Sequence, residues 1–401
     1  MMIVARSEEV YDQLMQRGVD IMRITDDSII FQPDNCIYPA NKIKTNRLSL
    51  LCDYDIVEIS DTGLLYRAYA NNESDSTIFL GAKCNSNCIM CPAGDAERKK
   101  GFSYSQDLLM KYIDYLPYDL EYLVMTGGEP TLQTNLFLES LDRVKEKFPY
   151  TQVLLLTNGR SLSDKWLFEQ VCQRHPNNFR IAIPVHGDNS ELHDYITRAP
   201  GSFEQTILAL RRLMNSDIKI ELRIVVTKAN CDNLLGIARL ISSKFPRVFC
   251  VNFIGLEPRG NCALNFDLLS RLRENGSVKN YAQICMQTLC RMRSASQGAD
   301  VIHRLQVLHV HVFLTAPLGT CHMAQPRADQ HQGGVAVREC PHHARPAADL
   351  PVQPLDHVVG ADARPVLAGK ITIGQRFLDA ALDPLRPDRP NVTKGAPKHP
   401  L

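Results

Sequence analysis

Three cysteines lie close together in the segment Lys83-Cys84-Asn85-Ser86-Asn87-Cys88-Ile89-Met90-Cys91-Pro92, with the spacing C-x3-C-x2-C. Thiolates this close in sequence can converge on one metal centre, and soft sulfur ligands select iron–sulfur clusters, zinc or copper(I). A structural zinc site needs four ligands, and no cysteine or histidine follows within the next several residues. The pattern favours a cubane cluster with one open iron, and the alternatives are a zinc loop or three free thiols.

A second candidate is the glycine-rich turn Gly127-Gly128-Glu129-Pro130, which follows another apolar run. Paired glycines let the backbone approach a ligand with no Cβ in the way, and a proline after Glu129 holds that carboxylate in a rigid turn. Such a carboxylate can accept a hydrogen bond from an ammonium group. The alternative is a plain tight turn between a strand and a helix that starts near Leu136.

Three weaker candidates lie after later apolar runs. Asn158, within Thr157-Asn158-Gly159, and His186, before Gly187, each follow a predicted strand. Either side chain could instead cap a helix or close a turn, and a histidine at a strand end can be satisfied by backbone groups alone. Arg198 could neutralise a carboxylate through a bidentate contact, or it could be an ordinary surface arginine.

The elements that must position these residues alternate between short apolar runs and longer amphipathic segments, from Thr77 to about Pro258. The expected strands are 77–81, 121–127, 152–157, 179–185, 218–226 and 248–255. Between them, apolar residues recur at helical spacing in 105–116, 133–148, 163–175, 203–215 and 234–245. Parallel neighbouring strands need long right-handed crossovers, so this alternation predicts a partial (β/α)6 barrel of the TIM-like type. Active sites in such folds form at the carboxyl ends of the strands.

The two ends of the chain differ from this middle part. Residues 1–75 combine a helix near Ser7–Arg17 with short apolar runs, which indicates a small α+β domain, and the barrel is expected to span 76–265. From about Ser294 prolines are frequent, and nine of the 12 histidines lie between His303 and His399. We therefore expect 266–401 to be an irregular, poorly ordered tail.

Composition excludes some classes of partner. The 401 residues carry 45 basic and 44 acidic side chains, so no overall field favours nucleic acid or an anionic membrane. The first residues lack the continuous apolar stretch of a signal peptide, and no later run reaches membrane length. A cytoplasmic location is the expectation. In that compartment thiols stay reduced, so the 13 cysteines are expected to be free or metal-bound.

The cysteine triplet after the first strand, followed by the Gly-Gly-Glu-Pro turn after the second, resembles the radical S-adenosylmethionine (radical SAM) superfamily. That resemblance implies a partial β/α barrel with a 4Fe–4S cluster on Cys84, Cys88 and Cys91 and S-adenosyl-L-methionine at the open iron. It also implies cofactor-binding roles for the residues Gly127, Gly128, Glu129, Asn158, His186 and Arg198. One departure is Met90, where many members carry an aromatic residue.

The stretches 183–213 and 251–262 resemble radical maturases that modify small peptides, in particular the His-Xaa-Ser system maturases (HxsC). This resemblance implies a ribosomally made peptide as substrate and a one-electron donor such as flavodoxin or ferredoxin. The alternatives are a radical enzyme that acts on a nucleobase or small heterocycle, and a non-enzymatic zinc-binding module. The C-terminal cysteines lack a compact spacing for further clusters, although Cys340, His342 and His343 could bind zinc.

Overall fold

The structure is a computed structural model that describes residues 1–39, 48–60, 64–257 and 259–269. All of these residues fall within one compact unit of the chain. The division into domains at 75 and 265 therefore stays a prediction. The predicted irregular tail lies outside the described residues from 270 onward, as does the candidate zinc site at Cys340.

The first sheet contains six strands in the order β4-β3-β2-β1-β5-β6, in which only β1 and β2 pair in parallel. Its strands are β1 (Met2–Ala5), β2 (Ile21–Ile24), β3 (Ser28–Gln32), β4 (Cys36–Pro39), β5 (Ile56–Ile59) and β6 (Leu65–Tyr69). Helix α1 (Glu8–Arg17) connects β1 to β2. The Ser7 side chain caps it by accepting from Val10 N, and Gly18 ends it in the left-handed conformation. The predicted α1 is confirmed, whereas β1 and β4 were not predicted.

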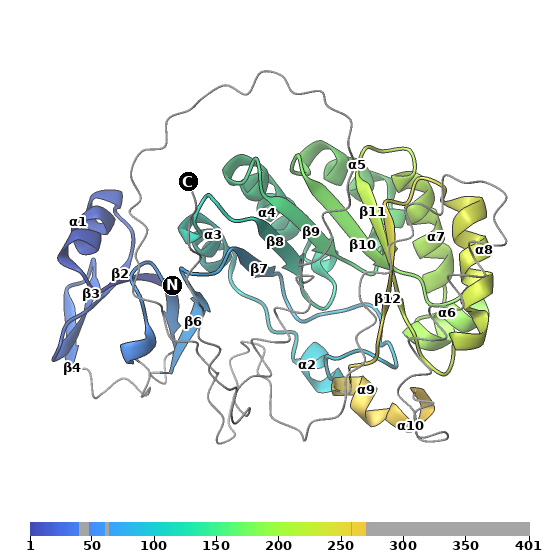
Figure 1. Cartoon of the computed structure of the whole chain (residues 1–401), viewed down its shortest axis with the longest axis horizontal. Helices are drawn as coiled ribbons and strands as arrows, with labels where there is room; N and C mark the ends of the chain where they lie inside the picture. The colour runs from blue at the N-terminus through green and yellow to red at the C-terminus, as the bar shows by residue number, and fades with distance from the viewer. Residues whose placement is uncertain (40–47, 61–63, 258, 270–401) are drawn as a thin grey trace, which may run out of the picture. The chain divides into compact units, whose positions relative to one another are not determined.

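The second sheet confirms the predicted parallel arrangement. Its strands are β7 (Asp75–Phe79), β8 (Tyr122–Thr126), β9 (Gln152–Leu156), β10 (Phe179–Pro184), β11 (Lys219–Val225) and β12 (Cys250–Ile254). They lie side by side in sequence order and every neighbouring pair is parallel. Because consecutive parallel strands are also neighbours, their carboxyl ends form one continuous edge (Figure 1).

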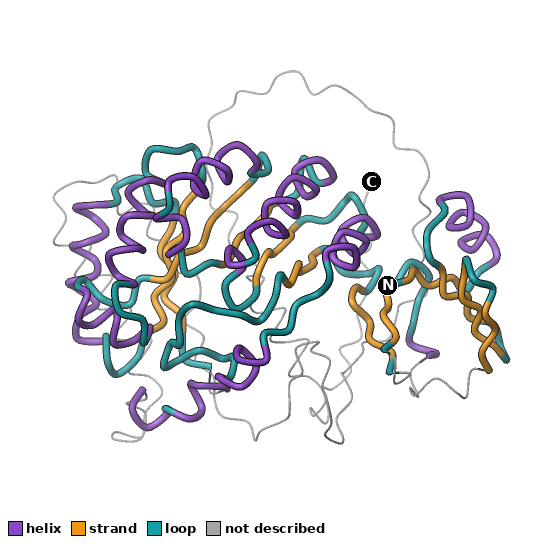
Figure 2. Tube along the Cα trace, turned by 180° about the vertical axis from the view of Figure 1, so that it is seen from behind, coloured by secondary structure: helices purple, strands orange, loops and turns teal. Residues whose placement is uncertain are grey.

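Five crossover helices cover one face of this sheet: α3 (Gln106–Tyr115), α4 (Thr134–Lys147), α5 (Lys165–Arg174), α7 (Ser202–Leu213) and α8 (Leu234–Lys244). Figure 2 shows the same layer from behind. Alternate strand residues, such as Leu123 and Met125 of β8, pack with the helices in one continuous core. Each strand therefore keeps a second set of side chains for the opposite, inner face. The predicted partial (β/α)6 barrel is confirmed.

Shorter elements were not predicted and bear on the site. They are α2 (Asp95–Lys100), α6 (Ser190–Thr197), α9 (Gly260–Leu264), α10 (Phe266–Leu269) and the 3-10 turns Leu48–Leu50, Pro130–Leu132, Arg160–Ser163 and Cys231–Asn233. The β10–β11 crossover thus contains two helices instead of one. In the described part of the chain, no helix has both the length and the apolar character needed to cross a bilayer.

Candidate cofactor site

The cysteine loop, residues 83–92, leaves the carboxyl end of β7 and is held by the end of α6. The backbone N–H of Asn87 donates to Thr197 O at 3.0 Å, and that of Ile89 donates to Ile196 O at 2.9 Å. Two amides of the loop therefore pair with backbone carbonyls more than 100 residues further along the chain. These backbone hydrogen bonds to α6 hold the loop in place.

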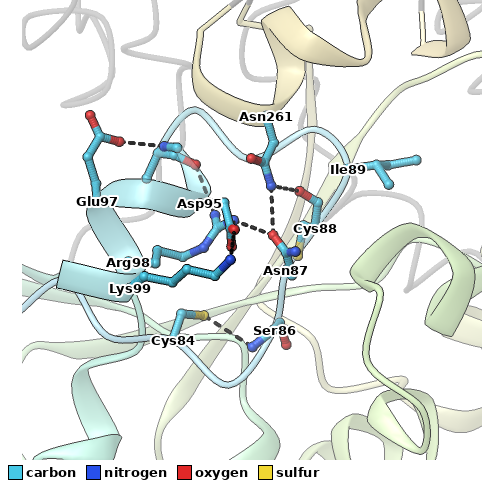
Figure 3. A network of polar contacts seen from close by, with 12 residues as sticks. Cys84, Ser86, Asn87, Cys88, Ile89, Asp95, Glu97, Arg98, Lys99 and Asn261 are labelled. Carbon is cyan, nitrogen blue, oxygen red and sulfur yellow. Dashed lines mark hydrogen bonds and ion pairs between the residues drawn. The ribbon is translucent and has the colours of Figure 1, made fainter. Parts of the chain in front are cut away.

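A buried arginine of α2 holds the same loop from the other side (Figure 3). Arg98, 7% exposed, donates through Nη2 to Asn87 Oδ1 and through Nη1 to Ala93 O at 2.9 Å. The thiol of Cys84 accepts from Ser86 N at 3.4 Å. Charge-assisted hydrogen bonds of this kind are about twice as strong as neutral ones, so Asn87 is a fixed point of the loop.

The three candidate thiols are half-buried. Burial raises the pKa of Cys84, and burial followed by the neighbouring Cys91 and Cys84 raises the pKa of Cys88 to about 12. The thiols are thus close enough to influence one another. Within the described residues, however, no three cysteine, histidine or acidic side chains are gathered at metal-binding distance.

The donor set nevertheless fits an iron–sulfur cluster. Three soft sulfur donors lie on one short loop that is fixed by hydrogen bonds at both ends, and Met90 and Ile89 make its surroundings apolar. Cys84, Cys88 and Cys91 are the residues that would hold the cluster. Because ligating thiols must be deprotonated, the raised pKa values of Cys84 and Cys88 mean that metal binding would release protons.

The two glycines of the Gly-Gly-Glu turn are required by the backbone of the cysteine loop. Gly128 N donates to Gly81 O at 2.8 Å, and Glu129 N donates to Lys83 O at 2.8 Å. A Cβ on Gly128 would overlap Ala82 O and would lie 2.5 Å from Lys83 O. The sequence suggested glycines for the approach of a ligand. The structure adds that they allow this turn to pack against the start of the cysteine loop.

Glu129 is buried, and its carboxylate ties the ends of β8 and β9 together. Oε1 accepts from Thr131 N at 3.1 Å, Thr131 Oγ1 at 2.6 Å and Thr157 Oγ1 at 2.7 Å, and Oε2 accepts from Asn158 N at 2.7 Å. Burial raises the pKa of Glu129, and these four donors oppose that rise. A carboxylate with four protein donors is a rigid part of the site.

Asn158 lies between the Gly-Gly-Glu turn and the cysteine loop. Its backbone N–H binds Glu129, while its side-chain Nδ2 donates to Asn85 Oδ1 at 2.6 Å and lies 3.9 Å from Cys84 Sγ. The structure thus brings three sequence-predicted residues, Cys84, Glu129 and Asn158, into one connected cluster. An amide beside a candidate ligand sulfur is suited to orient it.

His186 is buried at the carboxyl end of β10, and its ring Nδ1 has no hydrogen-bond partner. Its backbone N–H donates to His193 Nδ1 at 3.2 Å, and its carbonyl accepts from Asn230 Nδ2 at 3.2 Å. Burial lowers the pKa of His186 to about 3 and that of His193 to about 4. Both rings are therefore neutral at ordinary pH, and the backbone of His186 has a structural role.

The two buried histidines predict a loss of stability in mild acid. Below pH 6.5 the unfolded chain binds protons at both rings that the folded chain does not bind, so the free energy of unfolding falls from pH 6.5 toward pH 4. We expect His186→Gln to reduce the slope by up to about 1.4 kcal/mol per pH unit. Urea unfolding of both proteins at several pH values measures this, and equal slopes would contradict it.

Arg198 ends helix α6 in the left-handed conformation, with φ 49°, and its side chain is exposed. Its Nη2 donates to Asn265 Oδ1 at 3.1 Å, a residue of the segment that follows β12. The structure thus places Arg198 beside that segment. Its contact with a cofactor carboxylate stays a prediction.

A charged network on the inner face of the sheet was not predicted from the sequence. Glu221, 2% exposed, accepts from Arg223 Nε at 2.8 Å, Arg180 Nη1 at 3.2 Å and Asn252 Nδ2 at 2.7 Å. These partners lower the pKa of Glu221 although burial opposes them. The alternation of Ile220, Leu222 and Ile224 with charged residues in β11 was the sequence signal for a charged face of this strand.

Comparison with known proteins agrees with this architecture. Residues 78–241, from β7 to α8, match the Radical SAM superfamily. The antilisterial bacteriocin subtilosin biosynthesis protein AlbA of Bacillus subtilis (strain 168) is 27% identical over 187 residues, which are 46% of this chain and 40% of AlbA. A probable GTP 3',8-cyclase of Saccharolobus islandicus (strain Y.N.15.51 / Yellowstone #2) is 25% identical over 201 residues, 50% of this chain and 62% of the cyclase.

Among solved structures, Streptococcus suis SuiB bound to precursor peptide SuiA is 12% identical, with a TM-score of 0.38 over 46% of this chain and 40% of SuiB. The chain spans about half the length of the curated relatives that it matches. The superfamily match begins within β7 and ends within α8, so it covers β8 to β11 in full and includes both the cysteine loop and the Gly-Gly-Glu turn. Residues 78–241 therefore match the radical SAM superfamily, whose members use a 4Fe–4S cluster and S-adenosyl-L-methionine.

Proposed function

We propose that this protein is a radical SAM enzyme that modifies a ribosomally made peptide, with Cys84, Cys88 and Cys91 as the cluster ligands. The observation that supports it most strongly is the junction of the cysteine loop with the Gly-Gly-Glu turn. Cys84, Cys88 and Cys91 would hold a cluster that, when bound, would supply the electron for reductive cleavage of S-adenosyl-L-methionine to methionine and a hydrogen-abstracting 5'-deoxyadenosyl radical.

In this proposal the protein's own residues position the cofactor. Gly127 and Gly128 bring the turn against the start of the cysteine loop, and Glu129 locks the turn to Asn158. Asn158 then orients the loop through Asn85. His186 would contact the cofactor from the end of β10, and Arg198 would bind its carboxylate.

A peptide substrate is supported by the similarity to AlbA, a protein of bacteriocin biosynthesis. The second candidate, a nucleobase or other heterocycle, is supported by the similarity to the probable GTP cyclase. Among peptide maturases, we propose that the protein belongs to the HxsC group. A flavodoxin or ferredoxin would supply the electron.

The test is anaerobic reconstitution with iron and sulfide, followed by dithionite and S-adenosyl-L-methionine. We expect 5'-deoxyadenosine to form in an amount that grows with the cluster content. Adding GTP tests the second candidate, since a cyclase-type substrate would accelerate 5'-deoxyadenosine formation and become modified. A fully loaded protein that forms no 5'-deoxyadenosine would contradict the proposal.

A further inference from the structure

The segment that follows the last strand lies directly against the cysteine loop, although more than 160 residues separate them in sequence. Cys262 N donates to Cys91 O at 3.2 Å, and a Cβ on Gly260 would overlap Pro92 O. The side chain of Cys262 is fully buried in the cluster of apolar residues that includes Ile89. Residues 260–265, which include helix α9, therefore pack tightly on this loop.

Asn261 connects this segment to the part of the loop that carries Cys88. Its side chain is 3% exposed, and Nδ2 donates both to Asn87 Oδ1 at 2.8 Å and to Cys88 O at 3.1 Å (Figure 3). Asn87 Oδ1 also accepts from Arg98. One buried amide thus fixes the backbone of a candidate cluster ligand and the residue before it.

Asn265, one helical turn further, connects the loop to Arg198. Its Nδ2 donates to Ile89 O at 3.0 Å and to Asn261 O at 2.8 Å, while its Oδ1 accepts from Arg198 Nη2 at 3.1 Å. The amide therefore spans the space between the cysteine loop and the arginine that we assign to the cofactor carboxylate. In Asn265, both the amide nitrogen and the amide oxygen therefore have hydrogen-bond partners.

We propose that Asn261 and Asn265 are positioning residues, the first for the cluster ligand Cys88 and the second for Arg198. This inference rests on the proposed function and adds to it a third part of the chain, beyond the cysteine loop and the Gly-Gly-Glu turn. Residues that orient metal ligands contribute to metal affinity without touching the metal. The segment after the sheet then links the cysteine loop, which would hold the cluster, to Arg198, which would bind the carboxylate of S-adenosyl-L-methionine.

The first test replaces the amide of Asn261. We expect Asn261→Ala, after reconstitution, to lose iron to a chelator about 10–100-fold faster than the wild type, as for other residues that support metal ligands. Asn261→Asp keeps the side-chain volume but lacks the N–H donors, so it should lose iron like the alanine variant. If Asn261→Asp instead retains iron like the wild type, the side chain acts only through packing and the inference is wrong.

The second test addresses Asn265 by calorimetric titration of S-adenosyl-L-methionine into the reconstituted protein. We expect Asn265→Ala and Arg198→Ala each to raise the Kd about tenfold, with the double variant no weaker than Arg198→Ala alone, because both act through one guanidinium. An unchanged Kd in Asn265→Ala, or additive effects in the double variant, would overturn the role of Asn265.

Two controls separate this inference from general damage and from failure of the proposed function. Asn215→Ala removes an exposed amide just after α7 and should change neither iron loss nor Kd. Trp166, the single tryptophan, reports urea unfolding, and the variants should unfold near the wild-type midpoint. A wild-type protein that binds neither cluster nor S-adenosyl-L-methionine refutes the proposed function itself, whereas variants that match a functional wild type refute only this inference.

Discussion

Gly128→Ala is expected to destabilise the protein by about 1–3 kcal/mol or more and to prevent stable binding of the cluster. The added methyl group would overlap two carbonyl oxygens, those of Ala82 and Lys83, which are backbone atoms and cannot rotate away. Relief requires the start of the cysteine loop to move, which breaks the 2.8 Å hydrogen bond from Glu129 N to Lys83 O. Urea unfolding and the iron content after reconstitution measure the two effects.

Gly18→Ala is the matched control. Gly18 has a left-handed backbone with φ 63°, and a Cβ there would meet no atom within 4 Å. Its substitution should therefore cost only the conformational penalty of about 1 kcal/mol and leave iron binding unchanged. If Gly128→Ala were as mild as this control and bound iron fully, the close packing of the turn on the loop would not be important.

Cys88→Ala is expected to reduce both cluster content and 5'-deoxyadenosine formation by about a hundredfold or more, because a cubane held by two thiolates has lost a protein ligand. Cys88→Ser, which keeps the volume but offers a hard oxygen, should fail similarly. Cys36→Ala removes an exposed cysteine of β4 and serves as the control. Product formation at the wild-type rate in Cys88→Ala would exclude Cys88 as a ligand.

The architecture of the second sheet could be predicted because its signals are local. The spacing of apolar residues within each segment identifies that segment as a strand or as an amphipathic helix. The parallel arrangement of the strands follows from the length of the crossovers between them. The elements that were missed give weak local signals. Strand β1 has four residues at the start of the chain, and α6 is a short helix with only three buried side chains.

The two motifs of the candidate site could be predicted from the sequence, whereas the contacts between the motifs and their neighbours could not. The cysteine triplet and the Gly-Gly-Glu turn are visible as residue types at fixed spacing. The contact of Gly128 with Ala82, or of Asn261 with Cys88, depends on tertiary packing between segments up to 173 residues apart, and no sequence period records it. The same holds for the inner-face network around Glu221, because its arginine partners come from two different strands.

The central claim is that three cysteines of one loop hold a cubane with an open iron. Mössbauer spectroscopy of the anaerobically reconstituted protein, combined with iron, sulfide and zinc analysis, tests it most directly. We expect a 4Fe–4S cluster in which the signal of a single iron changes when S-adenosyl-L-methionine is added. One zinc or one iron per chain without sulfide would contradict the assignment of the cluster. A cluster whose spectrum does not change when S-adenosyl-L-methionine is added would also contradict it.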